Sequence, residues 1–421
     1  MRTRTFRGPM GLLAVAALIF GACSSAATPS PVPSAAPTTA PTTAASSAAP
    51  TTAPTTAASS AAPATATPAA SSAAPSASSG ASLKIGVVTD VGTVDDKNFN
   101  QFSYEGAVAG AADIGAAKPA VVVPNSSSDY ATDINGFVSQ NYNIIVTVGF
   151  NLTNATILAA KANPNIWFIG VDQAPLCITA TGAPDTAATP TCAGDPAKLL
   201  PKFIAIKYEE DQAGYLAGIV AASVSKTGKI GAIGGINLVP AVVRYIQGYV
   251  LGAQSVNPNI KVDVGYVTTS DFGKAFNDPA TGKTYATQFI QQKGDDVMFQ
   301  VAGKTGNGVL QAACAANIVG IGVDVNQYLS LNAASDPAYK CILTSAEKHL
   351  SNSVESSIKQ IAAGTAKGGN VIYNAASDGI GLAPFTPPSA VSASVQAKLD
   401  TALAAMKAGT LVTCPTKCGQ P

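Results

Sequence analysis

The chain has 421 residues with 25 Lys and Arg against 24 Asp and Glu, so its net charge indicates neither nucleic acid nor an anionic surface as a partner. Its one histidine, His349, offers no cluster of imidazoles for a metal site. The length suffices for two domains, although the composition of the first fifth does not favour folding.

The first residues have the pattern of a signal peptide. Three arginines among the first seven residues precede an apolar stretch over 10–22. This stretch is too short to span a bilayer, which takes about 20 apolar residues. The small residues Gly21 and Ala22 stand before Cys23, as in a bacterial lipoprotein signal. We expect residues 1–22 to be removed and Cys23 to be lipidated; an ordinary secretory peptide cut nearby is the alternative.

Residues 23–82 are mostly Ala, Pro, Thr and Ser, with repeats of APTTA and TTAASSAAP. Almost no large apolar side chain occurs there, so no core can offset the entropy of ordering the segment. We predict a flexible tether stiffened by proline, which holds the following domain away from a membrane or wall. This composition indicates a location and leaves the function open.

The folded part begins at residue 83. The apolar and β-branched run over 83–89 predicts a strand covered on both faces, as in a parallel sheet. The chain turns polar at Asp90 and takes a helical spacing from Asn98 onward. In open α/β sheets, ligands bind just beyond the carboxyl ends of the strands. Asp90, Phe99 and Asn100 therefore lie where ligand recognition is expected.

Strands and helices then alternate, which indicates right-handed parallel βαβ units. Residues 173–201 interrupt the pattern and are expected to form an insertion away from the mouth of the cleft, and a second series begins at residue 229. Two consecutive series of similar size predict two lobes. The predicted strands are 119–123, 143–148, 166–172, 202–207, 229–234, 260–267, 296–301, 318–323, 342–344 and 371–373, and the predicted helices are 129–140, 153–162, 209–226, 240–255, 280–293, 306–316, 346–363 and 394–407.

Six cysteines follow Cys23, and an even number in an exported chain favours disulfides. Proximity in the sequence favours pairing Cys177 with Cys192, Cys314 with Cys341, and Cys414 with Cys418, although other connectivities remain open.

Three acids follow predicted strands: Asp90, Asp172 and Asp324. Carboxyl ends of parallel strands converge on one crevice, where carboxylates accept hydrogen bonds from hydroxyls or from a base N–H. Each acid could instead cap the next helix. Phe99 and Phe276 could supply rings from opposite lobes for stacking on a base.

The neighbouring acids Asp95 and Asp96 follow the first strand, and at least one of them is expected to be a solvated turn residue. Catalytic motifs are missing from the sequence. The run AGKT at 302–305 lacks the glycine of a phosphate-binding loop, since Met298 occupies that position. No GxSxG elbow accompanies His349. We therefore expect no enzyme, cofactor or metal.

Five motifs in order resemble one family: TDVGTVDDKNFNQFSYEG after the first strand, EEDQAGYLAG at 209–218, KIGAIGG at 229–235, FNDPATGK at 276–283, and AGKTGNGVLQAA with IGVDVNQ over 302–327. The chain is similar to basic membrane lipoproteins, solute receptors of ABC importers whose studied members bind purine nucleosides. The resemblance implies the type I periplasmic-binding-protein fold, an α/β fold of two Rossmann-like lobes with parallel sheets joined by a hinge. On that pattern, lobe 1 comprises 83–206 and 343–370, and lobe 2 comprises 207–342 and 371–421.

The resemblance also implies roles for individual residues. Asp90 would read the base, Phe99 and Phe276 would stack on it, and Asp324 and Lys348 would hold the ribose hydroxyls. Gly303 would offer a backbone contact, and Asn154 would stand where the family has an acidic ribose contact. The implied protein is a monomeric lipoprotein on the outer face of the cell membrane that delivers a nucleoside to an ABC permease. A sensory receptor for a membrane kinase, a receptor for another polar solute and an exported hydrolase are the alternatives.

Overall fold

The computed structural model describes residues 82–420, all of which belong to one compact unit. The predicted signal peptide, the lipidation site Cys23 and nearly all of the predicted tether lie outside the described residues. Among the described residues, no helix combines the length and the apolar character that crossing a membrane requires.

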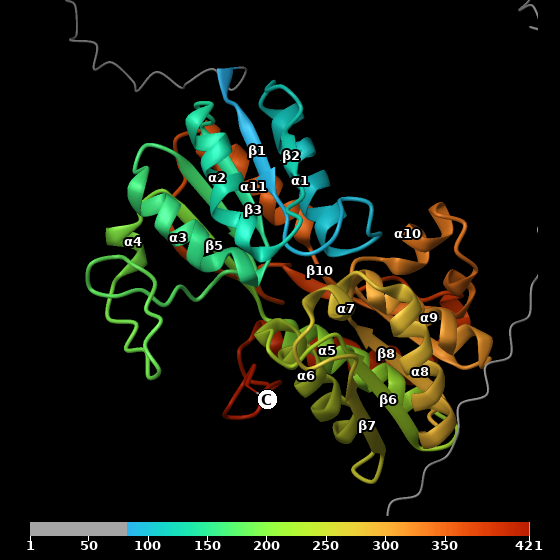
Figure 1. The fold of residues 1–421 in the computed structure, drawn as a ribbon. Helices are drawn as coiled ribbons and strands as arrows, with labels where there is room; N and C mark the ends of the chain where they lie inside the picture. Colours follow the sequence, from blue (N-terminus) through green and yellow to red (C-terminus); the bar gives the residue numbers. More distant parts are fainter. Residues whose placement is uncertain (1–81, 421) are drawn as a thin grey trace, which may run out of the picture. The chain divides into compact units, whose positions relative to one another are not determined.

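The described part of the chain forms two lobes, each built on a six-stranded sheet (Figure 1). The first sheet is entirely parallel and has the order β11-β5-β4-β3-β1-β2. Its strands are β1 (Ile85–Val88), β2 (Ala120–Val122), β3 (Ile144–Val148), β4 (Trp167–Val171), β5 (Phe203–Tyr208) and β11 (Gly369–Tyr373).

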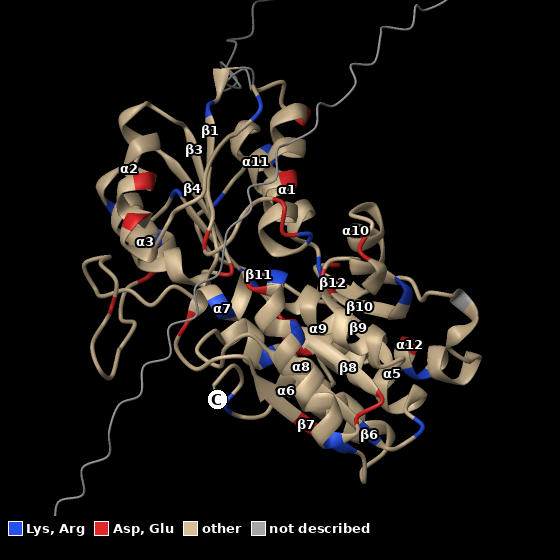
Figure 2. Cartoon of the chain, turned by 45° about the vertical axis from the view of Figure 1, so that its right-hand side comes forward, with Lys and Arg blue, Asp and Glu red and all other residues tan. Residues whose placement is uncertain are grey.

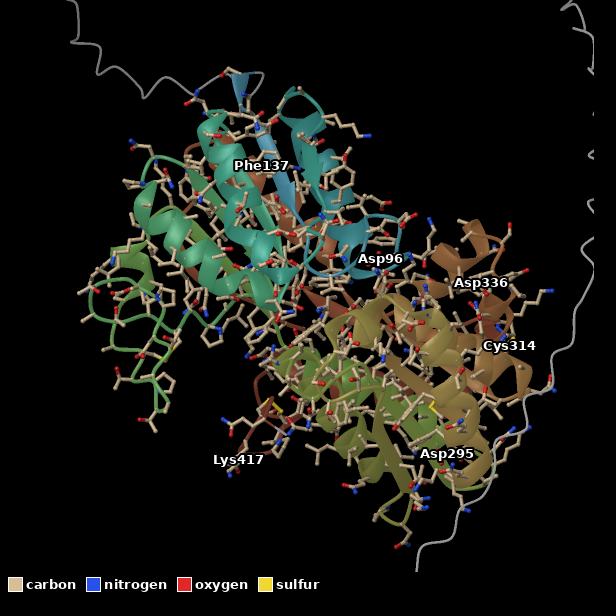
Figure 3. The ribbon with its side chains drawn as sticks, viewed as in Figure 1. Asp96, Phe137, Asp295, Cys314, Asp336 and Lys417 are labelled. Atoms are coloured by element: carbon tan, nitrogen blue, oxygen red, sulfur yellow. A yellow bond between two sulfur atoms is a disulfide. The ribbon has the colours of Figure 1, made fainter. Side chains whose placement is uncertain are left out.

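Successive side chains of the first sheet point to opposite faces, and both faces are covered. On β3, Ile144 and Val146 pack with α1 (Phe99–Asp113) and α11 (Leu350–Ala362), whereas Ile145 packs with α2 (Tyr130–Ser139) and α3 (Thr153–Ala162). This explains why the strands are apolar without alternation. A Cβ at Gly86 would lie 2.7 Å from the ring of Phe137 (Figure 3), so β1 needs glycine where α2 crosses it.

The second sheet has the order β12-β10-β9-β8-β6-β7, with only β12 antiparallel to its neighbour. The pair α5–α6 covers one face and the pair α8–α9 the other. Its elements are β6 (Lys229–Gly234), β7 (Lys261–Tyr266), β8 (Val297–Val301), β9 (Val319–Asp324), β10 (Ile342–Lys348), β12 (Ile380–Leu382), α5 (Glu210–Val224), α6 (Pro240–Val256), α7 (Phe272–Phe276), α8 (Pro279–Lys293), α9 (Gly303–Ala315), α10 (Gln327–Ala333) and α12 (Ala393–Lys407).

Within residues 82–420 the chain passes between the sheets three times: after β5, after β10 and after β11. The expected division placed 343–370 in lobe 1 and 371–421 in lobe 2. The pairing of the strands in the two sheets contradicts this division. Strand β10 pairs with β9 and so completes the second sheet, while β11 pairs with β5 in the first. The chain therefore leaves lobe 2 after Lys348 and leaves lobe 1 after Tyr373. In each case the strand first completes the sheet of its own lobe.

The other predicted elements match the structure to within a few residues, except that residues 346–348, expected in a helix, belong to β10. Besides 3-10 turns, four short elements were not predicted, namely α4 (Pro196–Leu199), α7, α10 and β12. All three favoured cysteine pairs are disulfides: Cys177–Cys192, Cys314–Cys341 and Cys414–Cys418. Figure 2 shows that charged residues of both signs occur on both lobes.

Helices α5 and α6 pack backbone to backbone through glycines. A Cβ at Gly218 would lie 2.1 Å from the carbonyl oxygen of Tyr249, and one at Gly252 would lie 2.0 Å from that of Tyr215. No real side chain tolerates such a distance, so the helices would have to separate. The helix predicted over 209–226 thus packs closely on α6 through its small residues.

We expect Gly218→Ala to lower the free energy of unfolding by about 1–3 kcal/mol, because the added methyl group forces α5 away from α6. Gly136→Ala in α2 is the matched control, since nothing lies within 4 Å of the new Cβ. That control should be neutral or stabilising by roughly 0.5–1 kcal/mol. Urea unfolding measures both, and equal effects of the two substitutions would contradict the close packing.

An acid pair lies near the amino ends of β7 and β8. Asp295, labelled in Figure 3, is 2% exposed, and neither of its carboxyl oxygens accepts a hydrogen bond from a donor among the described residues. Burial, and next the charge of Asp263, raise the pKa of Asp295 to about 7. Asp263 itself is paired with Lys261 and Lys293, at 3.0 and 3.6 Å.

Folded Asp295 keeps its proton up to about pH 7, whereas the unfolded residue loses it near its ordinary pKa of 3.8. The folded state therefore binds more protons between these values, and stability should fall as pH rises from 4 to 7. We expect Asp295→Asn to flatten this decline and to be more stable than the parent at pH 8, by about 1–3 kcal/mol.

The contrasting control is Asp296→Asn, because Asp296 accepts hydrogen bonds from Ser225, Lys226 and Thr227. These bonds hold its pKa below the usual value. Losing this carboxylate should destabilise the protein at pH 8. Unfolding curves at several pH values test both residues, and an unchanged slope in Asp295→Asn would refute the assignment.

Candidate ligand-binding site

A pocket lies between the two lobes at the carboxyl ends of their strands. Its lining includes Asp90, Phe99 and Asp172 from the first lobe and Phe276 and Asp324 from the second. Asp172 follows β4 and Asp324 ends β9. The expectation that acids at strand ends converge on one crevice is therefore met within a single pocket.

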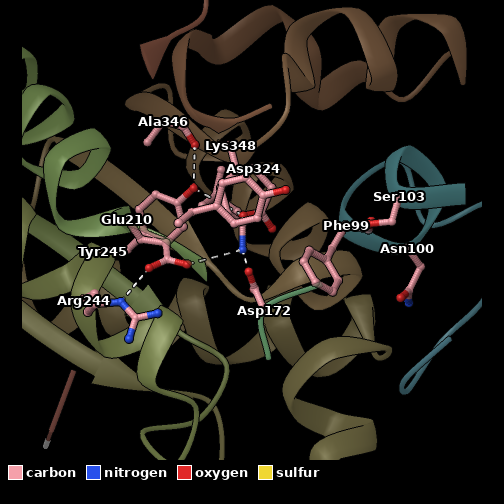
Figure 4. A network of polar contacts seen from close by, with 12 residues as sticks. Phe99, Asn100, Ser103, Asp172, Glu210, Arg244, Tyr245, Asp324, Ala346 and Lys348 are labelled. Atoms are coloured by element: carbon pink, nitrogen blue, oxygen red, sulfur yellow. Dashed lines mark hydrogen bonds and ion pairs between the residues drawn. The ribbon is translucent and has the colours of Figure 1, made fainter. Parts of the chain in front are cut away.

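The centre of the pocket is the ammonium group of Lys348, the last residue of β10 (Figure 4). Its Nζ lies 2.6 Å from Oδ2 of Asp172, 3.3 Å from Oδ1 of Asp324 and 4.0 Å from Oε1 of Glu210. The lysine side chain is 3% exposed and that of Glu210 is fully buried. Asp172 belongs to lobe 1 and the other acids to lobe 2, so this lysine links the lobes.

Aromatic rings enclose the same ammonium group. Its Nζ lies 4.7 Å from the ring centre of Phe99, 5.5 Å from that of Tyr208 and 5.8 Å from that of Tyr245. Rings at such distances attract a cation through their negative faces. The single proton of the Tyr245 hydroxyl is shared between Oδ1 of Asp324 and the Ala346 carbonyl oxygen, each at 3.3 Å.

Burial and pairing oppose each other in this cluster. Burial raises the pKa of Asp172 to about 6 although Lys348 acts to lower it. Burial also raises the pKa of Asp324. For Lys348, burial alone would lower the pKa, yet the three carboxylates together raise it above its ordinary value. The lysine is therefore charged at any physiological pH.

Asp90 lines the same pocket from the first lobe. The Tyr130 hydroxyl donates to its Oδ1 at 2.5 Å, and the Asn151 amide donates to the same oxygen at 3.3 Å. Burial raises the pKa of Asp90, against these hydrogen bonds. Gly149 has φ +113°, and a Cβ there would lie 2.6 Å from the Asp90 side chain, so only glycine fits beside this acid.

Asp96 is buried and caps α1. It accepts the backbone N–H groups of Asn98, Asn100 and Gln101 at 2.9 to 3.0 Å. Burial raises its pKa to about 6 in spite of these bonds. Asp95 is exposed, so the expectation that at least one of this pair is solvated holds. The cap fixes the start of the helix that presents Phe99 and Asn100 to the pocket.

Direct hydrogen bonds join the two lobes beside the pocket. The amide of Asn307 in α9 donates to the Asp96 carbonyl oxygen at 3.2 Å, and the hydroxyl of Ser330 in α10 donates to the Lys97 carbonyl oxygen at 2.9 Å. Gln327 donates to Oδ1 of Asn307 at 2.9 Å and so fixes its orientation. The segment that caps α1 therefore rests on the second lobe.

Seven of the eight predicted ligand residues line the pocket: Asp90, Phe99, Asn100, Phe276, Gly303, Asp324 and Lys348. The eighth, Asn154, is exposed on α3 and is not among the lining residues, which leaves its predicted contact without support. No residue of 173–201 lines the pocket either.

Several important residues escaped sequence reasoning. Asp172 was predicted to converge with Asp90 and Asp324 on one crevice, but the family resemblance gave it no individual contact. Tyr245, Phe150 and Asp96 line the pocket, and Glu210 supports it from behind. Asp172 shares the signal that identified Asp90 and Asp324. Tyr245 and Glu210 lie within helices, and no local pattern distinguishes them from ordinary helix residues.

Two lobes of parallel-dominated sheet, with a polar and aromatic pocket between them, define a solute-binding protein of the kind that serves ABC transporters. The chain belongs to the Bmp family of PnrA-like ABC transporter substrate-binding proteins, whose family model matches residues 83–410.

Known relatives agree with this assignment, and a solved structure shares the fold. The ABC transporter nucleoside-binding protein BmpA of Lactococcus lactis subsp. cremoris is 33% identical over 314 residues, which cover 71% of this chain and 81% of that protein. The CD4+ T-cell-stimulating antigen of Listeria monocytogenes is 30% identical over 320 residues, covering 72% and 81%. A solute-binding protein of an ABC transporter system from Aeropyrum pernix K1 has the same fold, with a TM-score of 0.64 at 22% identity over 80% of this chain and 94% of that one.

We expect Lys348→Met to lower the free energy of unfolding by about 3–5 kcal/mol at pH 8, because it leaves buried carboxylates without their cation. The loss should shrink at pH 5, where Asp172 and its neighbours take up protons instead. Lys359→Met is the control, since its exposed ion pairs with Asp113 and Glu355 should contribute little. Denaturant unfolding at both pH values is the measurement, and a loss independent of pH would contradict this account.

Proposed function

We propose that this substrate-binding protein captures a purine nucleoside in the interlobe pocket and delivers it to an ABC permease. The observation that carries the proposal is a set of buried acceptors without donors. Oδ1 of Asp172 and Oδ1 of Asn100 have no hydrogen-bond partner among the described residues, and both side chains line the pocket. An unpaired buried acceptor is costly, so these oxygens await ligand donors.

A nucleoside has donors and a ring in suitable positions. Its ribose hydroxyls suit the carboxylates around Lys348, and its base N–H suits Asp90 or Asn100. Phe99 and Phe276, which line the pocket from opposite lobes, supply stacking surfaces for the base. The name of the Lactococcus lactis relative supports the same ligand class.

The charges in the pocket disfavour an anionic ligand. The lining of the pocket contains one lysine and four acids, namely Asp90, Asp96, Asp172 and Asp324. A phosphate group would meet carboxylates rather than a cation, so a nucleoside should bind better than its nucleotide.

The remaining features follow from the proposal. We infer that Cys23 is lipidated and that the monomeric protein stays at the extracytoplasmic face of the cell membrane. The ligand stabilises one arrangement of the lobes, which the permease recognises. Binding needs no covalent chemistry, so inosine incubated with the protein should be recovered unchanged.

The test is a thermal shift of the purified chain with inosine or guanosine. Ligand at about 100 times its Kd should add roughly 2.7 kcal/mol of stability. Phe276→Ala should weaken binding by about 1–3 kcal/mol, because it removes one stacking surface. Phe289→Ala, a ring in α8 that does not line the pocket, should leave affinity unchanged.

Inosine monophosphate serves as the control ligand and should produce a smaller shift. No shift with any nucleoside, together with a clear shift by another polar solute, would refute the proposed ligand while leaving the solute-binding role intact.

A further inference from the structure

The charge cluster around Lys348 continues beyond the pocket. Oε2 of Glu210 accepts a hydrogen bond from Nε of Arg244 at 2.6 Å, while its other oxygen lies 4.0 Å from Nζ of Lys348 (Figure 4). Glu210 is fully buried and Arg244 is 8% exposed. Glu210 therefore lies between two cations. The more strongly Glu210 pairs with Arg244, the less it competes with Asp172 and Asp324 for the ammonium group of Lys348.

The C-terminal segment covers Arg244. Residues 413–420, which we name the C-terminal clip, are closed by the disulfide Cys414–Cys418. The backbone of Gly419 packs on the arginine, since a Cβ there would lie 3.2 Å from its Cγ and Nη1. Figure 3 shows Lys417 in this segment, outside the α5–α6 pair.

Hydrogen bonds fix both ends of the clip beside the Glu210–Arg244 pair. The Thr413 hydroxyl donates to Oδ2 of Asp211, the neighbour of Glu210, at 2.5 Å. Gln247, less than one turn after Arg244, accepts the N–H of Gly419 at 2.8 Å and donates to the Gln420 carbonyl oxygen at 2.9 Å. The clip thus brackets the pair from two sides.

Covering Arg244 changes the strength of its ion pair. An ion pair in a water-excluded site attracts more strongly than the same pair in water. Without the clip, water would solvate the guanidinium and weaken its hold on Glu210. The Glu210 carboxylate would then draw the Lys348 ammonium away from Asp172 and Asp324.

We propose that the C-terminal clip is a positioning element of the ligand site, which acts through Arg244 and Glu210 on Lys348. The clip lies beyond residue 410, where the match to the family model ends. The clip itself contributes no residue to the lining of the pocket. Its effect on binding is therefore indirect, and Arg244 and Glu210 are positioning residues.

The experiment removes one of two disulfides from the purified chain and compares the effects on inosine binding. The choice of inosine as the probe rests on the proposed function. C414A/C418A should weaken inosine binding about 5- to 20-fold by calorimetry. C177A/C192A removes a disulfide of the 173–201 segment and should change the Kd less than about twofold, within ordinary mutational scatter. Equal weakening by both, or an unchanged Kd in C414A/C418A, would overturn the proposal.

A double-mutant cycle separates positioning from general loosening. Arg244→Met should weaken binding, and Arg244→Lys, which keeps the charge, should restore part of the affinity. Adding C414A/C418A to Arg244→Met should produce little further loss, because the clip acts through this arginine. Fully additive losses would contradict the proposed route.

Hydrogen exchange provides a readout that needs no ligand. In the unliganded chain, C414A/C418A should speed amide exchange at 208–211 and 346–350, which are remote from the clip in sequence, whereas C177A/C192A should not. If the parent chain binds no nucleoside, the proposed ligand fails and this comparison still decides the role of the clip. Unchanged exchange in both segments would overturn that role.

Discussion

The buried ammonium group of Lys348 is the interaction on which the site depends. It lies at the end of β10, just before the chain crosses back to the first lobe, and it pairs with Asp172 of that lobe and with Asp324 of its own. Several carboxylates within a water-excluded pocket would repel one another without it. The same lysine therefore makes the pocket stable, links the lobes and orients the acids that a ligand would meet.

Close packing elsewhere serves this arrangement. The glycines between α5 and α6 allow the helices to approach closely, and these helices carry Glu210 and Tyr245 toward Lys348. At the facing edge of the pocket, Asp96 caps α1 and so fixes Phe99 and Asn100. Each ligand-facing side chain is thus held by a well-packed element, which is what a selective site requires.

The lobes are in direct contact as well as joined by crossing segments. Asn307 and Ser330 bind the carbonyl groups of Asp96 and Lys97 from the opposite lobe. These contacts involve the same loop that starts α1, so the position of Phe99 and the relative placement of the lobes are coupled through the backbone. A transporter that reads lobe placement would thereby read the state of the pocket.

The sequence alone determined the two α/β series and the acids at strand ends, because periodicity is a local property, and short-range proximity favoured the three neighbouring cysteine pairs that the structure contains. The family resemblance assigned β10 and β11 to the wrong lobes and gave Asn154 a contact that the pocket does not support. Only the tertiary structure decided which elements meet at the crossings, and hence that Lys348 pairs with Asp172 and Glu210, some 140 to 180 residues earlier. Such partners are set by the packing of distant helices and strands, which no local pattern encodes.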